Sequence, residues 1–414
     1  MKTTNLLLIV LTLTGITAFC VGCSDDDGKG SSNGNAKTIT LNAGQQQAAK
    51  SLSDFGWDFY KEVHDDINHA DDNIVASPLS MSYALALTAN GANGTTRSEI
   101  LQALDIDEAD IDVLNSYFKT IYNEMPSLSP NCKLLIANSI WANSDHGFEF
   151  IDPFKELAFS SYYAEDKSTT DKKYVADVNE WCSEKTNKLI PQFLAEGAKP
   201  QPFTIINALY FNAKWHEPFS KSEIRQQDFH NIDGSVTHVD FLKKTTIKKY
   251  MEGTTFRLLE YPYDGNTFSF YVLLPDEDEN LDAVFAEVKD SGWSSIKSQL
   301  RPRNLAISLP KFKSEYRISA GPSLEHLGII QLFGSPDLSN MTDSRISNIG
   351  ILQKCVLSID ERGAEGAAVT GIHGETSPGA PESPIAFDVD RPFIYLIEEN
   401  STGTIVFIGQ QVKF

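Results

Sequence analysis

The chain has 414 residues, of which 41% are hydrophobic and 22% charged, an ordinary composition for a globular protein. Its formal net charge of −21 disfavours nucleic acid as a partner, because the phosphate backbone repels an acidic surface. The excess of Asp and Glu is spread over the sequence, so we attribute it to solubility and infer no acidic groove from it.

The N-terminal residues have the pattern of an export signal. An apolar run over residues 6–22 is short for a membrane span and suits a secretory signal. Its end, residues 18–23, resembles a bacterial lipobox, although Cys20 stands where Leu is usual. The resemblance implies cleavage before Cys23 and lipidation of Cys23. An ordinary signal peptide that is cut elsewhere is the alternative.

The segment after Cys23 is typical of an anchored tether. Its acidic start, residues 24–27 (SDDD), is similar to the surface-export signal of some Gram-negative lipoproteins, and a flexible Gly/Ser/Asn linker follows. We therefore expect a lipoprotein signal peptide over residues 1–22, a tether over residues 23–44 and a single domain over residues 45–414. The resemblance implies an outer-membrane lipoprotein exposed on the cell surface, and we expect a monomer.

Two helical patterns open the domain. An amphipathic helix is expected from the spacing of Leu52, Phe55, Phe59, Val63 and Ile67. The next pattern, residues 73–94, is apolar or small at nearly every position; Ser77 can cap it, Pro78 suits its first position and Gly91 can end it. This second helix should be buried, so Ser77 and Ser80 need hydrogen-bond partners.

Strand-like runs dominate the rest of the chain. Residues 204–211, 268–274 and 405–412 are examples, and no internal repeat is found. Helices followed by many strands predict an α+β fold with large sheets.

The sequence contains no recognisable motif for catalysis, metal binding or cofactor binding. It has no phosphate-binding or dinucleotide fingerprint, and residues 30–34 match the nucleophile-elbow pattern in spelling alone, with no strand before them. Cys132, Cys182 and Cys355 form no C-x-x-C pair, and the His residues form no ligand pair. We therefore expect core thiols, no metal and no cofactor, and we expect no enzymatic activity, with an enzyme as the minor alternative.

Residues 359–378 are longer than a connection between the flanking strand-like runs requires. From Gly363 on, a period of two separates an uncharged face from a face that carries Glu365, His373 and Glu375. The uncharged face consists of Ala364, Gly366, Ala368, Thr370, Ile372, Gly374 and Thr376. Small, Gly-rich residues hold a strand poorly by propensity, so this pattern indicates a loop that can become a strand.

The order of several motifs resembles that of the serpin family. The matching pieces include residues 73–80 (NIVASPLS), 205–211 (IINALYF) leading into Lys214 and Trp215, 309–312 (LPKF), 391–397 (RPFIYLI) and 402–409 (TGTIVFIG). Each piece alone is weak, but together and in order they extend the resemblance over about residues 45–414.

The resemblance implies an α+β serpin fold, with a large central, mostly antiparallel sheet, smaller sheets, a cluster of helices and an exposed reactive-centre loop. It also implies a suicide-substrate protease inhibitor. In the family, the protease cleaves the loop and forms an acyl-enzyme, and the freed segment inserts into the central sheet and traps the protease. Insertion requires an uncharged face, because burying a charge is costly.

The hinge of the loop matches the family at Glu361, Gly363, Glu365, Ala367 and Ala368. It departs at Ala364, where Thr or Ser is usual, and at Gly366, where Ala is usual, but both residues remain small and uncharged.

The sheet-opening region is also implied by the resemblance. Gln353 stands where many members have His, and Ser77, Ser80 and Asn207 would be its neighbours. Gln can donate and accept hydrogen bonds but cannot titrate. Trp215 matches the Trp at the top of the sheet, where insertion begins.

The expected scissile bond joins Thr376 and Ser377, with Glu375-Thr376 as second choice. Counting from Glu361 as the family does leads there, and Pro378 disfavours cleavage directly before it. Without Lys, Arg or aromatic residues nearby, the target would be an elastase-like or subtilisin-like serine protease, or a cysteine protease.

A non-inhibitory serpin-fold binding or scaffold lipoprotein is the competing hypothesis, supported by Ala364, Gly366 and Gln353.

Overall fold

The computed structural model describes residues 37–66, 71–346, 349–364 and 383–414. The expected signal peptide, Cys23 and loop residues 365–382 lie outside this range. The folded body begins before Gln45, because Ile39 and Leu41 are buried and the Ile39 amide donates to Ser401 Oγ over 2.9 Å. Residues 37–44, which we expected to be part of the tether, therefore belong to the body.

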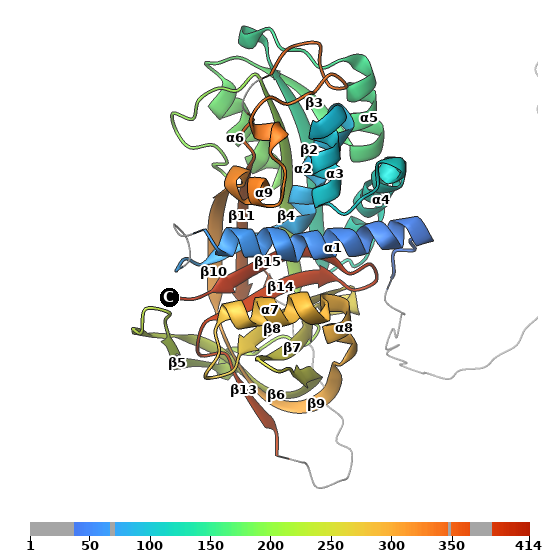
Figure 1. Cartoon of the computed structure of the whole chain (residues 1–414). Helices are drawn as coiled ribbons and strands as arrows, with labels where there is room; N and C mark the ends of the chain where they lie inside the picture. The colour runs from blue at the N-terminus through green and yellow to red at the C-terminus, as the bar shows by residue number, and fades with distance from the viewer. Residues whose placement is uncertain (1–36, 67–70, 347–348, 365–382) are drawn as a thin grey trace, which may run out of the picture. The chain divides into compact units, whose positions relative to one another are not determined.

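The helices of the described residues lie mostly in the first half of the chain (Figure 1). They are α1 (Ala43–His64), α2 (Pro78–Gly91), α3 (Gly94–Ala103), α4 (Ile111–Glu124), α5 (Asp152–Tyr162), α6 (Tyr174–Lys185), α7 (Leu281–Ser291), α8 (Trp293–Ser298) and α9 (Gly321–His326). Short 3-10 turns occur at Glu108–Asp110, Met125–Ser127, Ser144–His146, Lys221–Glu223, Asp264–Asn266 and Gln331–Phe333.

The helix boundaries follow from local capping. Asn42 and Gln45 form a reciprocal capping box at the start of α1, and Ser77 Oγ accepts the Ser80 amide at the start of α2. As expected, Pro78 is the first residue of α2 and Gly91 its last. Helix α1 ends at His64, earlier than the predicted pattern, which extended to residue 67.

One sheet of nine strands forms the larger part of the β structure. In spatial order its main path is β1 (Ile74–Ala76), β15 (Thr404–Gln411), β14 (Phe393–Glu399), β8 (Phe268–Pro275), β7 (Phe256–Pro262), β6 (Val236–Glu252), β9 (Arg301–Pro310) and β13 (Ile385–Asp388). Strand β5 (Ile224–His230) pairs with β6.

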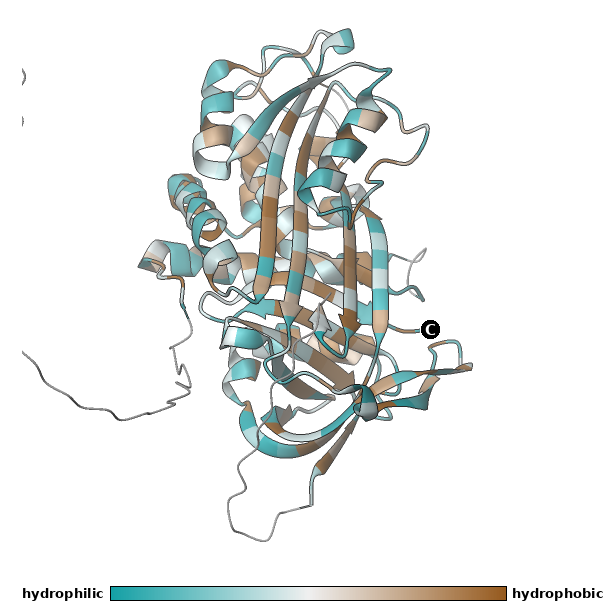
Figure 2. Ribbon diagram, turned by 180° about the vertical axis from the view of Figure 1, so that it is seen from behind, coloured by the Kyte–Doolittle hydropathy of each residue, from teal (hydrophilic) through white to brown (hydrophobic). Residues whose placement is uncertain are grey.

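The second sheet has six strands and is seen face-on in Figure 2. Its order is β10 (Phe312–Ser319), β11 (Leu352–Asp360), β12 (Gly363–Ala364), β4 (Phe203–Lys214), β2 (Cys132–Asn143) and β3 (Ala164–Thr169). Among the described strands, only β2–β3 and β9–β13 pair in parallel. The predicted α+β fold with large, mostly antiparallel sheets and a cluster of helices is confirmed.

The core follows from burial along whole elements. Strands β8, β14 and β15 are buried at every position, and α2 is buried around most of its circumference, as its apolar composition predicts. Cys132, Cys182 and Cys355 are buried free thiols, in agreement with the sequence. None of the described helices combines the length and apolar character needed to cross a membrane.

Candidate functional site: the hinge of the six-stranded sheet

A strand of two residues, β12, occupies a position between two long neighbours. On one side Ala364 pairs with Ile359 of β11, and on the other side Ala364 pairs with Ala213 of β4, both antiparallel. Ala364 is buried, with 1% of its surface exposed. Two residues of the expected hinge, Gly363 and Ala364, therefore form a short strand within the sheet.

Over the residues that the structure describes, the strand position between β4 and β11 is vacant beyond β12. Over the described residues, β4 and β11 are joined only through β12, because β4 otherwise pairs with β2 and β11 with β10. Residues 203–212 and 352–358 thus have no strand pairing on the sides that face each other. Backbone edges of this kind accept an added strand.

The turn that leads into β12 is fixed by backbone contacts. Asp360 Oδ1 accepts the amides of Arg362 and Gly363 over 2.7 and 3.1 Å. Gly363 has φ +143°, and a Cβ at this position would lie 1.9 Å from the Ala213 carbonyl oxygen. Only glycine fits such a conformation and such a close approach.

Trp215 directly follows the last residue of β4 and donates two hydrogen bonds to carbonyl groups of this turn. Its indole Nε1 donates to the Asp360 carbonyl over 2.9 Å, and its amide donates to the Arg362 carbonyl over 2.8 Å. The ring is buried and stacks on Tyr263 at 4.5 Å. The structure thus places Trp215 at the entry of the vacant position.

Glu361 is held by residues of two connecting segments, Lys311 between β9 and β10 and Phe219 between β4 and β5. Its carboxylate pairs with Lys311 Nζ at 2.7 Å, and its backbone carbonyl accepts the Phe219 amide over 2.9 Å. The hydrogen bond from Lys311 lowers the pKa of Glu361 against the smaller opposing effect of burial. The hinge therefore begins from a residue that is held on both its side chain and its backbone.

Gln353 is buried near the start of β11 and binds the start of α2. Its side-chain Oε1 accepts the Ser77 amide over 2.9 Å, and its Nε2 donates to the Ser77 carbonyl over 2.8 Å. Ser77 Oγ in turn accepts the Ser80 amide over 3.1 Å. The structure therefore brings Gln353, Ser77 and Ser80 together.

Asn207 belongs to a separate chain of hydrogen bonds. Its Nδ2 donates to Asn138 Oδ1 over 2.6 Å, and Asn138 Nδ2 donates to the Tyr162 carbonyl over 2.7 Å. Asn207 Oδ1 is buried and has no hydrogen-bond partner among the described residues. Instead of binding Gln353, Asn207 therefore retains a buried acceptor beside the vacant strand position.

Helix α6 covers part of this region. Val178 and Trp181 of α6 belong to one buried cluster with Ile206 of β4 and Val356 of β11. The carboxylate of Glu165 on β3 accepts Trp181 Nε1 over 3.1 Å and pairs with Lys167 at 2.8 Å and with Lys185. A strand that enters between β4 and β11 must therefore pass beneath a helix that is anchored at its far side.

The site offers backbone edges rather than reactive groups. The one thiol on β11, Cys355, is buried, and burial raises its pKa far above neutral pH, so it remains a protonated core residue.

Candidate residues Glu365, Gly366, Ala367, Ala368, Glu375, Thr376 and Ser377 lie outside the described residues. The structure adds Ala213 and Lys311 to the site, and it places Asp360 in the charged turn that residues 360–363 form in the sequence.

Comparisons with known proteins decide the family. The family model described as "Serpin (serine protease inhibitor)" matches residues 50–414. The chain belongs to the serpin family. Serpins are a family of protease inhibitors that bind target proteases, although some members do not inhibit.

Individual serpins resemble this chain over most of their length. A "Serine protease inhibitor" of Cyanea capillata is 31% identical over 82% of this chain and 92% of its own length. "Serpin-ZX" of Arabidopsis thaliana is 32% identical with the same coverage. The crystal structure of a thermophilic serpin, tengpin, in its native state has a TM-score of 0.80, 30% identity and coverage of 92% of this chain and 97% of tengpin.

Proposed function

We propose that this serpin is a suicide-substrate inhibitor of an extracellular protease, which it traps by inserting its cleaved loop into the six-stranded sheet. The observation that carries the proposal is β12, which starts a strand between β11 and β4 in a position that is otherwise vacant over the described residues. Completing that strand would satisfy two backbone edges at once, which is a large favourable change. The uncleaved state would then be kinetically trapped.

The register of β12 predicts which residues of the inserted loop would pair with β4 and β11. If the strand continues as it begins, each later residue pairs one position earlier on β4, so Thr370 comes to lie between Asn207 and Gln353, and Gly374 reaches Phe203. The Thr370 hydroxyl would then be able to donate to Asn207 Oδ1, the buried acceptor that has no partner among the described residues. The vacant position on β4 thus ends shortly before the expected scissile bond.

The same register explains where the charges of the loop lie. On the second face, Ala367 and Val369 would come opposite Val356 and Ala208, which belong to the cluster beneath α6. Glu365 lies before this covered stretch, and Glu375 lies after it. Both faces are therefore uncharged where the inserted strand would be enclosed.

The trapping reaction needs one covalent step. The protease hydroxyl or thiol adds to the carbonyl carbon of Thr376, the bond to the Ser377 nitrogen breaks, and the Ser377 amine leaves with the proton. The small, β-branched surroundings of this bond favour an elastase-like or subtilisin-like serine protease, or a cysteine protease. Glu375-Thr376 is the second choice of bond.

We further propose that Cys23 carries the lipid anchor and that the inhibitor is exposed on the outer membrane as a monomer. The support comes from the sequence, since the apolar run ends in a lipobox-like motif and an acidic segment follows. Radiolabelled palmitate in the wild type, and none in a Cys23→Ser variant, would test this; equal labelling of both would contradict it.

The experiment for inhibition is to incubate the full chain with subtilisin, elastase and papain and to look for a complex that survives boiling in SDS. Sequencing the released peptide identifies the cleaved bond. Loop cleavage should also raise the melting temperature sharply. Cleavage that yields neither a covalent complex nor a higher melting temperature would reject the proposal in favour of a non-inhibitory scaffold.

A matched pair of variants tests insertion itself. Thr370→Glu places a charge on the face that would be buried, whereas His373→Glu places one on the face that already carries charge. We expect Thr370→Glu to be cleaved with less than about a tenth of the wild-type yield of complex, since a buried charge costs several kcal/mol. His373→Glu should keep most of its yield, and equal yields would argue against this register.

A further inference from the structure

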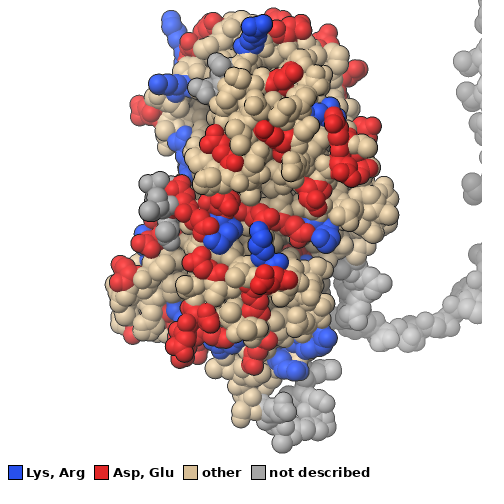
Figure 3. Space-filling view, viewed as in Figure 1, with Lys and Arg blue, Asp and Glu red and all other residues tan. Residues whose placement is uncertain are grey.

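The end of α1 and the start of α7 lie side by side, far along the chain from each other (Figure 1). Lys61 of α1 lies 3.4 Å from Asp282 of α7, and Lys289 of α7 lies 3.2 Å from Asp58 of α1. Figure 3 shows a band of acidic and basic side chains across this part of the molecule. Within this band, His64 at the end of α1 lies beside the carboxylates of Asp65 and Asp282.

The tautomer of His64 is fixed from the core side. Its Nδ1 lies 2.7 Å from Gln410 Oε1, and the residue is 9% exposed. Gln410 Nε2 donates to the Asp72 carbonyl over 3.0 Å, which orients the amide and makes Oε1 an acceptor. Tyr60 also donates to this oxygen, over 3.3 Å. His64 Nδ1 must therefore donate, and in the neutral ring the lone pair is on Nε2.

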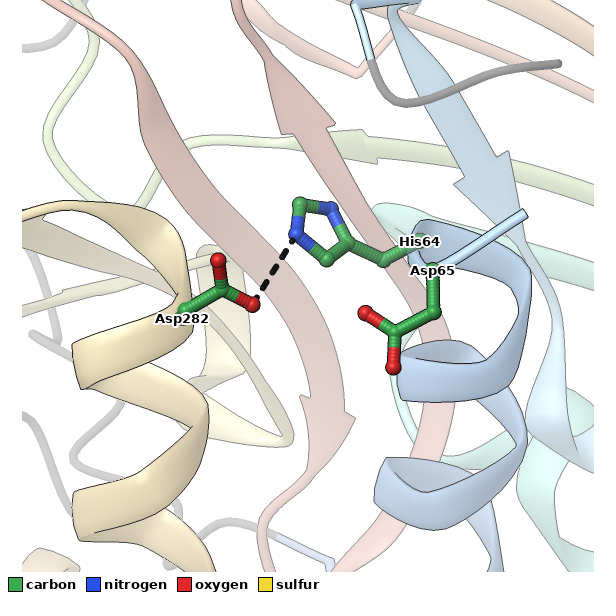
Figure 4. A group of neighbouring side chains, drawn as sticks. All are labelled: His64, Asp65 and Asp282. Carbon is green, nitrogen blue, oxygen red and sulfur yellow. Dashed lines mark ion pairs between the residues drawn. The ribbon is translucent and has the colours of Figure 1, made fainter. Parts of the chain in front are cut away.

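That lone pair faces carboxylates. Figure 4 shows His64 and Asp282 pointing toward each other, with Asp65 beside them. His64 Nε2 lies 3.7 Å from Asp282 Oδ1, which is beyond hydrogen-bond distance. One ligand atom from each of His64, Asp65 and Asp282 lies within 4.8 Å of the others.

These distances suit a shared cation. Two ligand atoms bound tetrahedrally at about 2.0–2.1 Å from zinc lie about 3.3–3.4 Å apart, so small side-chain movements complete the site. One imidazole and two carboxylates suit zinc and its neighbours better than calcium or magnesium, which prefer oxygen. A metal-bound His almost always donates its other ring N–H to an oxygen acceptor, and the Gln410 side-chain oxygen takes that place here.

We propose that His64, Asp65 and Asp282 bind a divalent transition-metal ion of the zinc type, which fastens the end of α1 to the start of α7. Gln410 orients the imidazole, and water completes the coordination. The site is separate from the hinge and from the proposed trapping reaction.

Lys61 is the competitor for this site. Its ammonium pairs with Asp65 and lies 3.4 Å from Asp282, so it neutralises part of the charge that would attract the ion. It also lies 5.6 Å from the centre of the Phe285 ring, where it can remain when the carboxylates turn to the metal. Removing the Lys61 charge should therefore strengthen metal binding, whereas it would only weaken a purely ionic cluster.

The test is titration of the full chain, stripped with a chelator, with zinc sulfate in a calorimeter. We expect one zinc ion per chain at micromolar affinity and a higher melting temperature with zinc. Asp282→Asn, at a side chain that is 62% exposed, should fold normally and weaken binding at least about tenfold. His64→Gln should do the same, and Lys61→Gln should tighten binding.

His326→Gln is the matched control. His326 pairs with a single carboxylate, Glu62, at 3.1 Å, so its loss should leave zinc affinity unchanged. No zinc binding below about 1 mM, or equal affinity of the wild type and Asp282→Asn, would overturn the proposal. Weaker zinc binding in Lys61→Gln would also contradict it, because the ammonium would then support the site rather than compete for it.

Discussion

Gly363 on β12 lies so close to Ala213 on β4 that a Cβ at residue 363 would be 1.9 Å from the Ala213 carbonyl oxygen. This contact brings the start of the loop into the sheet as a paired strand. It also makes the hinge sensitive to a single methyl group.

Gly363→Ala should therefore expel β12 from the sheet. The clash and the positive φ together should lower the free energy of unfolding by about 1–3 kcal/mol. Urea denaturation measures this change. Gly350→Ala is the control, because no heavy atom lies within 4 Å of a Cβ there. Equal stability of the two variants would show that β12 is not held against β4 in solution.

The ion pair of Glu361 and Lys311 should make hinge stability depend on pH. The pKa of Glu361 is lowered in the folded protein, so its contribution is present above the unfolded value of about 4.3 and is lost as pH falls through the folded value. Glu361→Gln should cost about 1 kcal/mol near neutral pH, after allowance for solvent screening, and nothing at low pH. Melting curves across this pH range measure the difference.

Asp152→Asn is the matched control for Glu361→Gln. Its partner Lys155 lies 2.9 Å away, but the Asp152 side chain is 94% exposed. Its removal should be nearly neutral at every pH. A constant difference between wild type and Glu361→Gln down to pH 2 would disprove the linkage.

Gln353 should be important for stability because it satisfies both backbone groups of Ser77. Gln353→Leu leaves the buried Ser77 N–H without this partner, whereas the Ser77 C=O still accepts the Met81 amide over 3.0 Å, so we expect a cost of about 1–3 kcal/mol. Gln102→Leu, at an exposed position on α3, should be nearly neutral. A thermal melt that shows equal losses would refute the role assigned to Gln353.

Gln353→His should introduce a pH dependence that the wild-type residue cannot supply. An unperturbed His titrates near pH 6.5, whereas Gln has no charge to lose. The rate of complex formation in the variant should change between about pH 5 and 8 relative to the wild type. Parallel pH profiles of the two proteins would contradict this expectation.

The contacts of Glu165 with Trp181 and Lys185 should control how fast α6 is displaced during loop insertion. Burial raises the pKa of Glu165, but hydrogen bonds from Lys167, Lys185 and Trp181 outweigh it and hold the pKa at about 2, so the carboxylate stays charged. Glu165→Gln loses about 1 kcal/mol of this anchoring. Loop insertion, followed by stopped-flow fluorescence after cleavage, should become about fivefold faster.

Glu180→Gln is the control for the anchor, because Glu180 is an exposed carboxylate on α6 itself, the helix that Glu165 holds from β3. Its insertion rate should equal that of the wild type. If Glu165→Gln also leaves the rate unchanged, displacement of α6 does not limit insertion.

The sequence alone determined the fold class, and it predicted what the loop could do. The helical signals at Ser77, Pro78 and Gly91 were local, because capping and helix termination depend on neighbouring residues, and α2 begins and ends as they predict. The alternation from Gly363 onward was also a local pattern. Recognising this pattern required only the observation that every second residue from Ala364 to Thr376 is uncharged.

The tertiary structure decided which residues meet. Pairing of Gly363 with Lys214, the hydrogen bonds of Gln353 to Ser77 and the approach of His64 to Asp282 all join segments that are distant in sequence. Spacing rules detect ligands on one helix or one turn, so they gave no metal signal at His64. Such contacts depend on how sheets and helices pack, and packing is a property of the whole chain rather than of any local segment.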